Sequence, residues 1–368
     1  MRKRIFKNMD YGILICVAIL LVVGLIALYS ATQSSDYAEF KKQIMWIGIS
    51  IPIMIVIIFV DYETIAKVSP ILYGIVLIAL VGVLFTEPIN GATSWFTIGS
   101  ISVQPAEFAK IIVIIALAHY MSIIQEQNPD NVSKPLKLLK ILAIVGVPIL
   151  LIIKQPDYGT ALAFVVAITF MLFVSGIKKR YIIGGILIVA VMLPVLYFFV
   201  LPEHAKTRID VFLNPNLDPR GAGYNVIQSK LAIGAGEFLG MGVLKGNQTQ
   251  LGFLYPKTTD FIFAVIGEEM GFVVAAIVII SYVILITRII YIAKTAKNML
   301  GSYIAIGIAG VFIFHMVENI GMTMGLLPIT GVPLPFVSYG GSSLLTNLIM
   351  IALLLNISGR RQKAIFIE

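Results

Sequence analysis

An aspartate stands where the longest polar stretch of the chain meets an apolar run. Asp260 follows Thr258 and Thr259 and precedes an apolar segment that opens with Phe261. A carboxylate at such a boundary can act as a general base, because partial burial raises its pKa from about 3.9 toward neutrality. Thr and Asp side chains also cap helices, since their oxygens accept hydrogen bonds from free N–H groups. Both interpretations are open at this point.

Two opposite charges, Glu107 and Lys110, lie inside another apolar run. Positions three apart share one face of a helix, so the two side chains can pair. Charged groups within a membrane span are costly and normally face a polar cavity or each other. The pair therefore marks the interior of a helix bundle, whether its role is structural or functional.

Two further carboxylates are candidates. Asp157 lies in the short polar segment 154–160, where an Asx turn or a helix cap would also account for it. If one helix runs from Asp260 to Glu268, the two are about 12 Å apart along its axis, more than the roughly 5 to 9.5 Å between paired glycosidase carboxyls. A single base is therefore favoured, and Glu268 is expected to bind, cap a cavity or pair with a cation.

Metal, nucleotide and disulfide chemistry have weak support. His315 and Glu318 have the i, i+3 spacing of some helical metal ligands, but no matching second pair is visible. The Gly-rich stretch 234–252 contains no Gly-Lys-Ser/Thr phosphate loop. Cys16 is the single cysteine of the chain, so no disulfide framework is expected.

The elements that must position these residues are membrane helices. Of 368 residues, 59% are hydrophobic and 12% are charged, against about 25% charged in soluble domains. A span needs about 20 apolar residues, and ten runs qualify. The predicted spans are 11–30, 43–60, 69–85, 103–122, 138–153, 160–177, 181–201, 260–287, 299–327 and 340–357. The expected fold is an all-α polytopic membrane protein, with residues 1–368 as one domain.

The distribution of Lys and Arg predicts the orientation of the spans. Seventeen of the 27 fall on the side of the N-terminus and nine on the opposite side, with only Lys110 inside a span. Because cytoplasmic loops retain positive charge, both termini are expected to be cytoplasmic. The segment 202–259 then becomes one large extracellular loop between helices seven and eight, whose part 223–238 reads as a short helix on the membrane surface. The basic net charge of +8 thus suits a membrane surface rather than nucleic acid.

Several motifs in one order carry a family resemblance that covers nearly the whole chain. They are Trp95 and the segments 104–110, 155–160, 218–224, 228–230, 259–263 and 331–342. On these motifs the chain resembles the SEDS family (shape, elongation, division and sporulation). One departure precedes Asp260: many relatives read Pro-Glu-x-His-Thr-Asp, whereas this chain reads Pro256-Lys257-Thr258-Thr259-Asp260. Roles of the missing Glu and His cannot be transferred.

The resemblance implies a ten-helix glycosyltransferase of the bacterial cell membrane that polymerises lipid II into peptidoglycan strands during cell-wall elongation and shape maintenance. It also implies a class B penicillin-binding protein, a transpeptidase, as partner, together with other elongation-machinery membrane proteins. Asp260 matches the aspartate regarded as catalytic, and Glu107 and Lys110 match a charged pair needed for activity. Other motif positions near the substrate cavity are Trp95, Asp157 and Arg208.

The hypothesis that follows is base catalysis at the outer membrane boundary. Asp260 deprotonates the 4-hydroxyl of an acceptor GlcNAc, which attacks the anomeric carbon of a lipid-linked MurNAc and displaces the pyrophosphate. Arg208, Lys230 or a divalent cation (Mg²⁺ or Mn²⁺) is expected to stabilise the departing charge. Two other functions fit the same pattern: a lipid II flippase, and a noncatalytic scaffold that recruits the transpeptidase.

Overall fold

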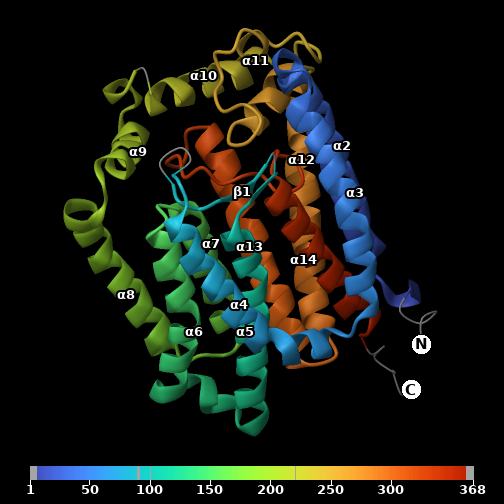
Figure 1. Cartoon of the computed structure of the whole chain (residues 1–368), viewed down its shortest axis with the longest axis vertical. Coiled ribbons are helices and arrows are strands. Elements are labelled where there is room, and N and C mark those ends of the chain that lie inside the picture. Colours follow the sequence, from blue (N-terminus) through green and yellow to red (C-terminus); the bar gives the residue numbers. More distant parts are fainter. Residues whose placement is uncertain (1–5, 89–91, 100, 220, 362–368) are drawn as a thin grey trace.

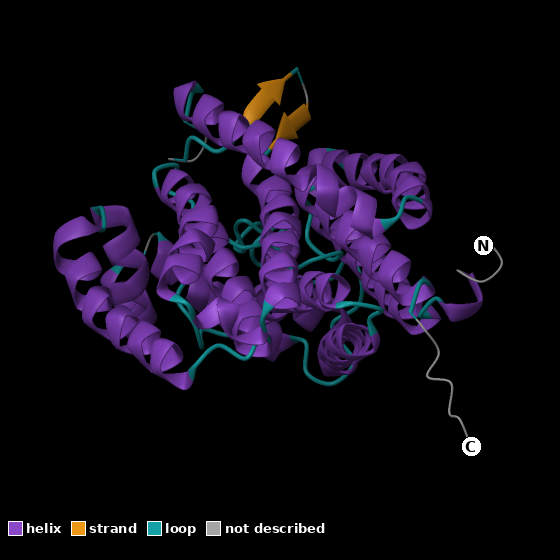
Figure 2. Cartoon of the chain, turned by 90° about the horizontal axis from the view of Figure 1, so that it is seen from below, coloured by secondary structure: helices purple, strands orange, loops and turns teal. Residues whose placement is uncertain are grey.

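The computed structural model describes residues 6–88, 92–99, 101–219 and 221–361. Arg220, part of one family motif, lies outside these residues. Helices dominate the described chain, together with one short hairpin (Figures 1 and 2). The helices are α2 (Tyr11–Ala31), α3 (Ala38–Phe59), α4 (Tyr62–Gly82), α5 (Pro105–Gln127), α6 (Pro135–Ile153), α7 (Tyr158–Val174), α8 (Lys179–Val195), α9 (Glu203–Leu213), α10 (Ala222–Ala235), α11 (Asn247–Gln250), α12 (Ile262–Thr295), α13 (Met299–Thr323) and α14 (Gly341–Gly359). Strands β1 (Phe96–Ile98) and β2 (Ile101–Val103) pair antiparallel.

The apolar helices agree with the predicted membrane architecture. Eight helices of the described chain are long and apolar enough to cross a membrane, and α7 is a shorter apolar helix. Helix α8 lies within the remaining predicted span and continues into a π-helical turn, Leu196–Val200. The protein is therefore a helical, multi-pass membrane protein. The hairpin β1–β2 was not predicted, because strands of three residues give no usable periodicity.

Burial divides the helices into an inner and an outer set. Within the apolar windows, 89% of α14, 72% of α13 and 67% of α5 are buried, against 11% of α3 and 22% of α6. Helix α13 packs against α12, α7 and α5, and α14 packs against α3. The large apolar side chains exposed on the outer helices provide the surface that hydrocarbon covers.

Capping residues set where several helices begin. Asp10, Asp61 and Asn298 accept hydrogen bonds from free N–H groups in the first turns of α2, α4 and α13, at 3.1, 3.0 and 3.0 Å. Such caps satisfy donors that would otherwise be unpaired. They place the polar turns at the ends of the apolar runs.

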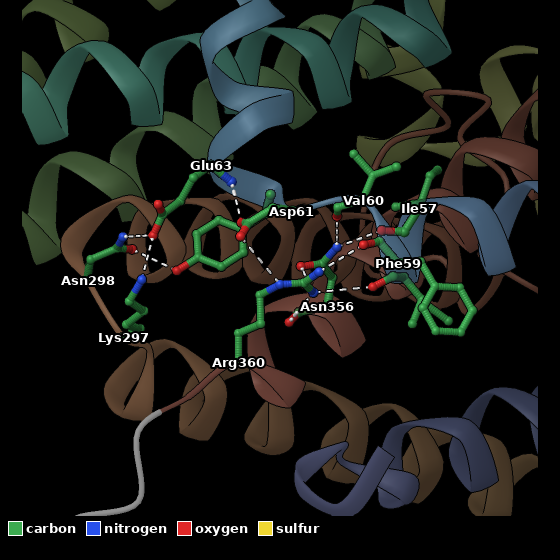
Figure 3. Close-up of polar contacts among 11 residues, drawn as sticks. Ile57, Phe59, Val60, Asp61, Glu63, Lys297, Asn298, Asn356 and Arg360 are labelled. Carbon is green, nitrogen blue, oxygen red and sulfur yellow. Dashed lines mark hydrogen bonds and ion pairs between the residues drawn. The ribbon is translucent and has the colours of Figure 1, made fainter. Parts of the chain in front are cut away.

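The described chain begins and ends at one end of the molecule, and the segment 202–259 lies across the other (Figure 1). The first of these ends is fixed by a polar cluster around Arg360, shown in Figure 3. The guanidinium of Arg360 donates to Asn356 Oδ1 at 2.6 Å and to the carbonyl of Phe59 at 3.0 Å. Nearby, Lys297 Nζ pairs with Glu63 at 3.1 Å. These contacts join the end of α14 to the α3–α4 and α12–α13 turns.

The segment 202–259 folds into helices α9, α10 and α11 and rests on a break in α12. Gly271 has a φ of +74°, a left-handed conformation that glycine adopts without steric cost. The carbonyls of Glu268 and Glu269 accept hydrogen bonds of 2.9 Å from the backbone N–H groups of Met241 and Gly242. The predicted helix within 223–238 is confirmed as α10.

Candidate active site

Asp260 lies in the turn before α12 rather than within the helix, which begins at Ile262. The N-cap residue is Phe261 and no side chain caps the helix, so the interpretation of Asp260 as a helix cap is wrong. The carboxylate is therefore free for another role. One continuous helix from Asp260 to Glu268 was assumed in the sequence analysis. This assumption also fails, because Asp260 lies in the turn that precedes α12.

The backbone around Asp260 is fixed from two sides. Asn319 Nδ2 and Thr323 Oγ1, both on α13, donate to the carbonyl of Asp260 at 3.0 and 3.5 Å. Ser338 Oγ donates to the carbonyl of Thr259 at 2.6 Å, and the backbone N–H of Tyr339 donates to the carbonyl of Thr258 at 2.9 Å. The position of the Asp260 side chain is thus set by α13 and the loop before α14.

The carboxylate of Asp260 and the guanidinium of Arg208 both lie near Gly331. Gly331 has a φ of +76°, and a Cβ built on it would lie 3.6 Å from Asp260 Oδ2 and 4.0 Å from Arg208 Nη1. Arg208 lies on α9, and its Nη1 donates to the carbonyl of Ile329 at 3.4 Å. Two side chains of opposite charge from distant parts of the chain therefore lie at the same loop.

Burial and charge act on Asp260 in opposite directions. Burial raises the pKa of its carboxyl above the usual range, and a hydrogen bond from Thr259 and the charge of Arg208 partly lower it. The residue as a whole is half-buried in the described structure. A carboxylate with a raised pKa is suited to act as a general base.

Two further candidate residues, Lys230 and Trp95, lie on α10 and just before β1. Lys230, on α10, is exposed and lies over Gly325, where a Cβ would come within 2.6 Å of Lys230 Nζ. Its neighbour Ser229 donates to the carbonyl of Thr323 at 2.6 Å, which fixes α10 against α13. Trp95 is half-buried just before β1, and the adjacent Ser94 donates to the carbonyl of Gln155 at 3.2 Å.

Asp157 is a helix cap with a second partner. Its Oδ1 accepts a hydrogen bond from the N–H of Thr160 at 3.1 Å at the start of α7, as the capping interpretation predicted. Its Oδ2 accepts from Gln104 Nε2 at 2.7 Å. Both oxygens are thus used to join α7 to the residue before α5.

Glu107 and Lys110 form the predicted pair in the interior. Lys110 Nζ lies 2.9 Å from Glu107 Oε1, and both side chains are almost fully buried. Lys110 Nζ also contacts His315 Nε2 at 3.1 Å, and Thr346 Oγ1 donates to Glu107 Oε2 at 3.1 Å. The pair therefore joins α5 to α13 and α14.

Glu268 has a partner that the sequence did not reveal. Its oxygens accept from the N–H groups of Gln248 and Thr249 at 2.7 and 3.0 Å, and from Thr249 Oγ1 at 2.7 Å. Its carboxylate is thus bound to the loop at α11, away from the hydrogen bonds that hold Asp260. No three His, Cys, Asp or Glu side chains of the described chain are arranged to hold a metal ion.

Sequence reasoning missed the contributions of Asn319, Thr323 and Gly331. His315, Asn319 and Thr323 are spaced by four on an otherwise apolar helix, and residues four apart share one face. Polar groups within a span normally face the bundle interior. The spacing of these three polar residues could have indicated that this face of the helix points toward the site.

Comparison with known proteins agrees with this architecture. Residues 11–363 match the FtsW/RodA/SpoVE family, described as cell cycle proteins. The chain is 36% identical to peptidoglycan glycosyltransferase MrdB of Escherichia coli K12, over 96% of this chain and 95% of that protein. It is 32% identical to peptidoglycan glycosyltransferase RodA of Treponema pallidum, over 98% of this chain and 100% of that protein.

A solved structure gives the same result for the fold. It is described as "Structural coordination of polymerization and crosslinking by a peptidoglycan synthase complex" and superimposes with a TM-score of 0.81 at 29% identity. The match covers 95% of this chain and 97% of that one. The chain therefore belongs to the FtsW/RodA/SpoVE family of cell cycle proteins.

Proposed function

We propose that this membrane protein is a peptidoglycan glycosyltransferase that polymerises lipid II into glycan strands, with Asp260 as its general base. Relatives at 36% and 32% identity over almost the whole chain carry the name of this activity. The observation that carries the assignment of the base is the carboxylate of Asp260, which caps no helix and lies at the Gly331 loop, as the guanidinium of Arg208 does.

The proposed reaction is an inverting displacement. Asp260 takes the proton of the 4-hydroxyl of an acceptor GlcNAc, and the oxygen forms a bond to the anomeric carbon of a donor MurNAc. The bond between that carbon and the pyrophosphate oxygen breaks, and the pyrophosphate leaves with the electron pair. The proton held on Asp260 then passes to solvent. Proton transfer by a positioned group contributes typically 10²- to 10⁴-fold to a rate.

Two cationic side chains are proposed to stabilise the departing charge. Arg208 is supported by its position beside Asp260 at Gly331, and Lys230 by the attachment of α10 to α13. Preorganised cations at a developing negative charge are a large source of catalysis. A divalent cation, Mg²⁺ or Mn²⁺, is the proposed alternative to these side chains, because Mg²⁺ is commonly held by one or two protein carboxylates together with substrate phosphates.

The proposed function also includes an orientation of the protein in the membrane and partner proteins. We place both termini in the cytoplasm and the segment 202–259 outside, supported by the Lys and Arg distribution and by the described chain beginning and ending at one end of the molecule (Figure 1). A class B penicillin-binding protein is the proposed partner, supported by the similar chain in a peptidoglycan synthase complex. Other elongation-machinery membrane proteins follow from the family alone.

Purified protein in nanodiscs, supplied with lipid II and its transpeptidase partner, tests the proposal. The account expects glycan strands on gel electrophoresis. A lipid II flippase would move labelled lipid II between leaflets and make no strands. A noncatalytic scaffold would do neither, and either result would overturn the proposal.

A further inference from the structure

One face of α13 holds the loop that borders Asp260. His315, Glu318 and Asn319 each contact the loop segment 330–333, which precedes α14. Glu318 Oε1 accepts from Thr330 Oγ1 at 2.8 Å, and Asn319 Nδ2 donates to the carbonyl of Val332 at 2.8 Å. We call residues 330–333 the strap. Three polar residues within two turns of one apolar helix thus bind the same short segment.

His315 joins the strap to the buried ion pair. Its Nε2 lies 3.1 Å from Lys110 Nζ, and its Nδ1 lies 3.0 Å from the carbonyl oxygen of Pro333. A lysine ammonium only donates hydrogen bonds and a carbonyl only accepts them. Nε2 must therefore accept and Nδ1 must carry the proton, which defines a neutral imidazole in a single tautomer. The ring is thus an obligatory link between a donor on one side and an acceptor on the other.

The chain of contacts extends in both directions. On one side Lys110 pairs with Glu107 at 2.9 Å, and Glu107 accepts from Thr346 on α14 at 3.1 Å. On the other side the strap contains Gly331, the residue near which the side chains of Asp260 and Arg208 lie. Asn319 closes the path, because the same Nδ2 donates to the carbonyls of Val332 and Asp260. A continuous series of contacts therefore runs from the intramembrane pair to the turn of Asp260.

We propose that His315 is a positioning residue for the reaction: its imidazole transmits the fixed position of the Glu107–Lys110 pair to the strap, and through the strap to Asp260 and Arg208. The inference rests on the proposed function, since positioning matters only if Asp260 is the base. In this proposal the buried Glu107–Lys110 pair holds the strap in position through His315 and does not itself contact the substrate. It also replaces the metal-ligand interpretation of His315 and Glu318 with hydrogen bonds to the strap.

The physical reason lies in the surroundings of the ring. His315, Lys110 and Glu107 are all almost fully buried, and a hydrogen bond in a low-dielectric interior is stronger than one in water. Loss of the imidazole leaves one donor of Lys110 and the carbonyl of Pro333 unpaired, which frees the strap to shift. Misplacement of a reacting group by about 1 Å can cost 100-fold in rate.

Three substitutions separate the two bonds of the ring. His315→Asn keeps a donor near the position of Nδ1, His315→Gln keeps an acceptor near the position of Nε2, and His315→Phe keeps the ring volume without either bond. Each variant is purified in nanodiscs with the partner transpeptidase. Measured are kcat and KM for lipid II, together with the thermal midpoint of unfolding. The parent chain and Asp260→Asn are assayed in parallel.

The expected result is an order of kcat values. His315→Phe, which keeps neither bond, loses about 10- to 100-fold in kcat with KM nearly unchanged. His315→Asn and His315→Gln, which each keep one of the two bonds, lie between His315→Phe and the parent chain. A ring that only fills space would make His315→Phe the most active variant, and that outcome overturns the inference. If His315→Phe does not fold, the other two variants decide, because the parent kcat in both His315→Asn and His315→Gln also overturns the inference.

The parallel reactions distinguish this failure from failure of the proposed function. A parent chain that makes no strands, or an Asp260→Asn variant that still makes them, rejects the proposed function itself. An active parent, an inactive Asp260→Asn variant and a fully active His315→Phe variant reject only the positioning role.

Discussion

The side-chain amide of Asn319 donates a 3.0 Å hydrogen bond to the backbone carbonyl of Asp260. The same nitrogen donates at 2.8 Å to the carbonyl of Val332. One side chain on α13 thus fixes the distance between the turn that carries the proposed base and the strap that faces it. A central helix of the bundle thereby sets the geometry of a site at its end.

Replacement of Asn319 by Asp is expected to lower kcat by about 10- to 100-fold. The carboxylate has nearly the same size but cannot donate, so two carbonyls lose their partner and face a negative charge. The readout is the rate of strand formation at saturating lipid II. Asn128→Asp is the matched control, because Asn128 Oδ1 accepts a hydrogen bond from the N–H of Asp130 and a carboxylate accepts it equally well. Equal rates for the two variants would contradict the role of Asn319.

The buried ion pair is expected to show a non-additive effect on stability. Glu107→Gln or Lys110→Met alone leaves one charge unpaired in the interior, which costs about 3 to 5 kcal/mol. The double variant removes both charges and is expected to lose less stability than the sum of the single variants. Thermal unfolding in detergent measures this. Additive losses would show that the 2.9 Å contact carries no coupling energy.

Asp260 predicts an acid limb in the pH profile of kcat. The base acts only when deprotonated, so activity is lost as pH falls through its pKa, which burial raises above the usual range of a carboxyl. Arg208 lowers this pKa, so Arg208→Gln is expected to move the limb to higher pH as well as to reduce kcat. Arg180→Gln, an exposed arginine at the start of α8, is the control and leaves the limb in place. If the acid limb does not move in Arg208→Gln, the charge of Arg208 does not affect the pKa of the catalytic base.

Gly331→Ala tests the strap without a change of charge. A Cβ at Gly331 has room, since its nearest atom lies 3.6 Å away, but the φ of +76° disfavours any side chain by about 1 to 2 kcal/mol. We expect a modest loss of stability together with a lower kcat, because relaxation of the strap moves it relative to Asp260. Gly176→Ala is the control. Gly176 lies just after the C-terminal end of α7 and has a φ of +73°, so an alanine there introduces the same backbone strain. The Gly176→Ala variant is expected to lose similar stability and to keep the parent kcat. Equal kcat values in the two variants would show that the position of the strap does not affect the reaction.

The sequence predicted the helical membrane fold and the Glu107–Lys110 pair, because apolar run length and i, i+3 spacing are local properties. The capping role of Asp157 was local too, and the structure confirms it. The family resemblance, carried by motifs in a fixed order, is also confirmed.

What the sequence could not predict depends on contacts between distant segments. Glu268 binds the loop at α11 twenty residues earlier in the chain, and the hydroxyl of Ser338 reaches the carbonyl of Thr259. The alternative interpretation of Asp260 as a helix cap failed, because residue types at a boundary do not show which residue begins the helix. The catalytic role of Asp260 itself stays a prediction.

The most direct test of the account is the rate of lipid II polymerisation by Asp260→Asn. The amide keeps the size of the side chain but cannot take a proton, so kcat should fall by about 100-fold or more while the thermal midpoint and lipid II binding stay close to the parent values. Asp36→Asn, at an exposed carboxylate 3.2 Å from Lys41 Nζ, is the control and should be fully active. A folded Asp260→Asn variant that makes glycan strands at the parent rate would contradict the central claim.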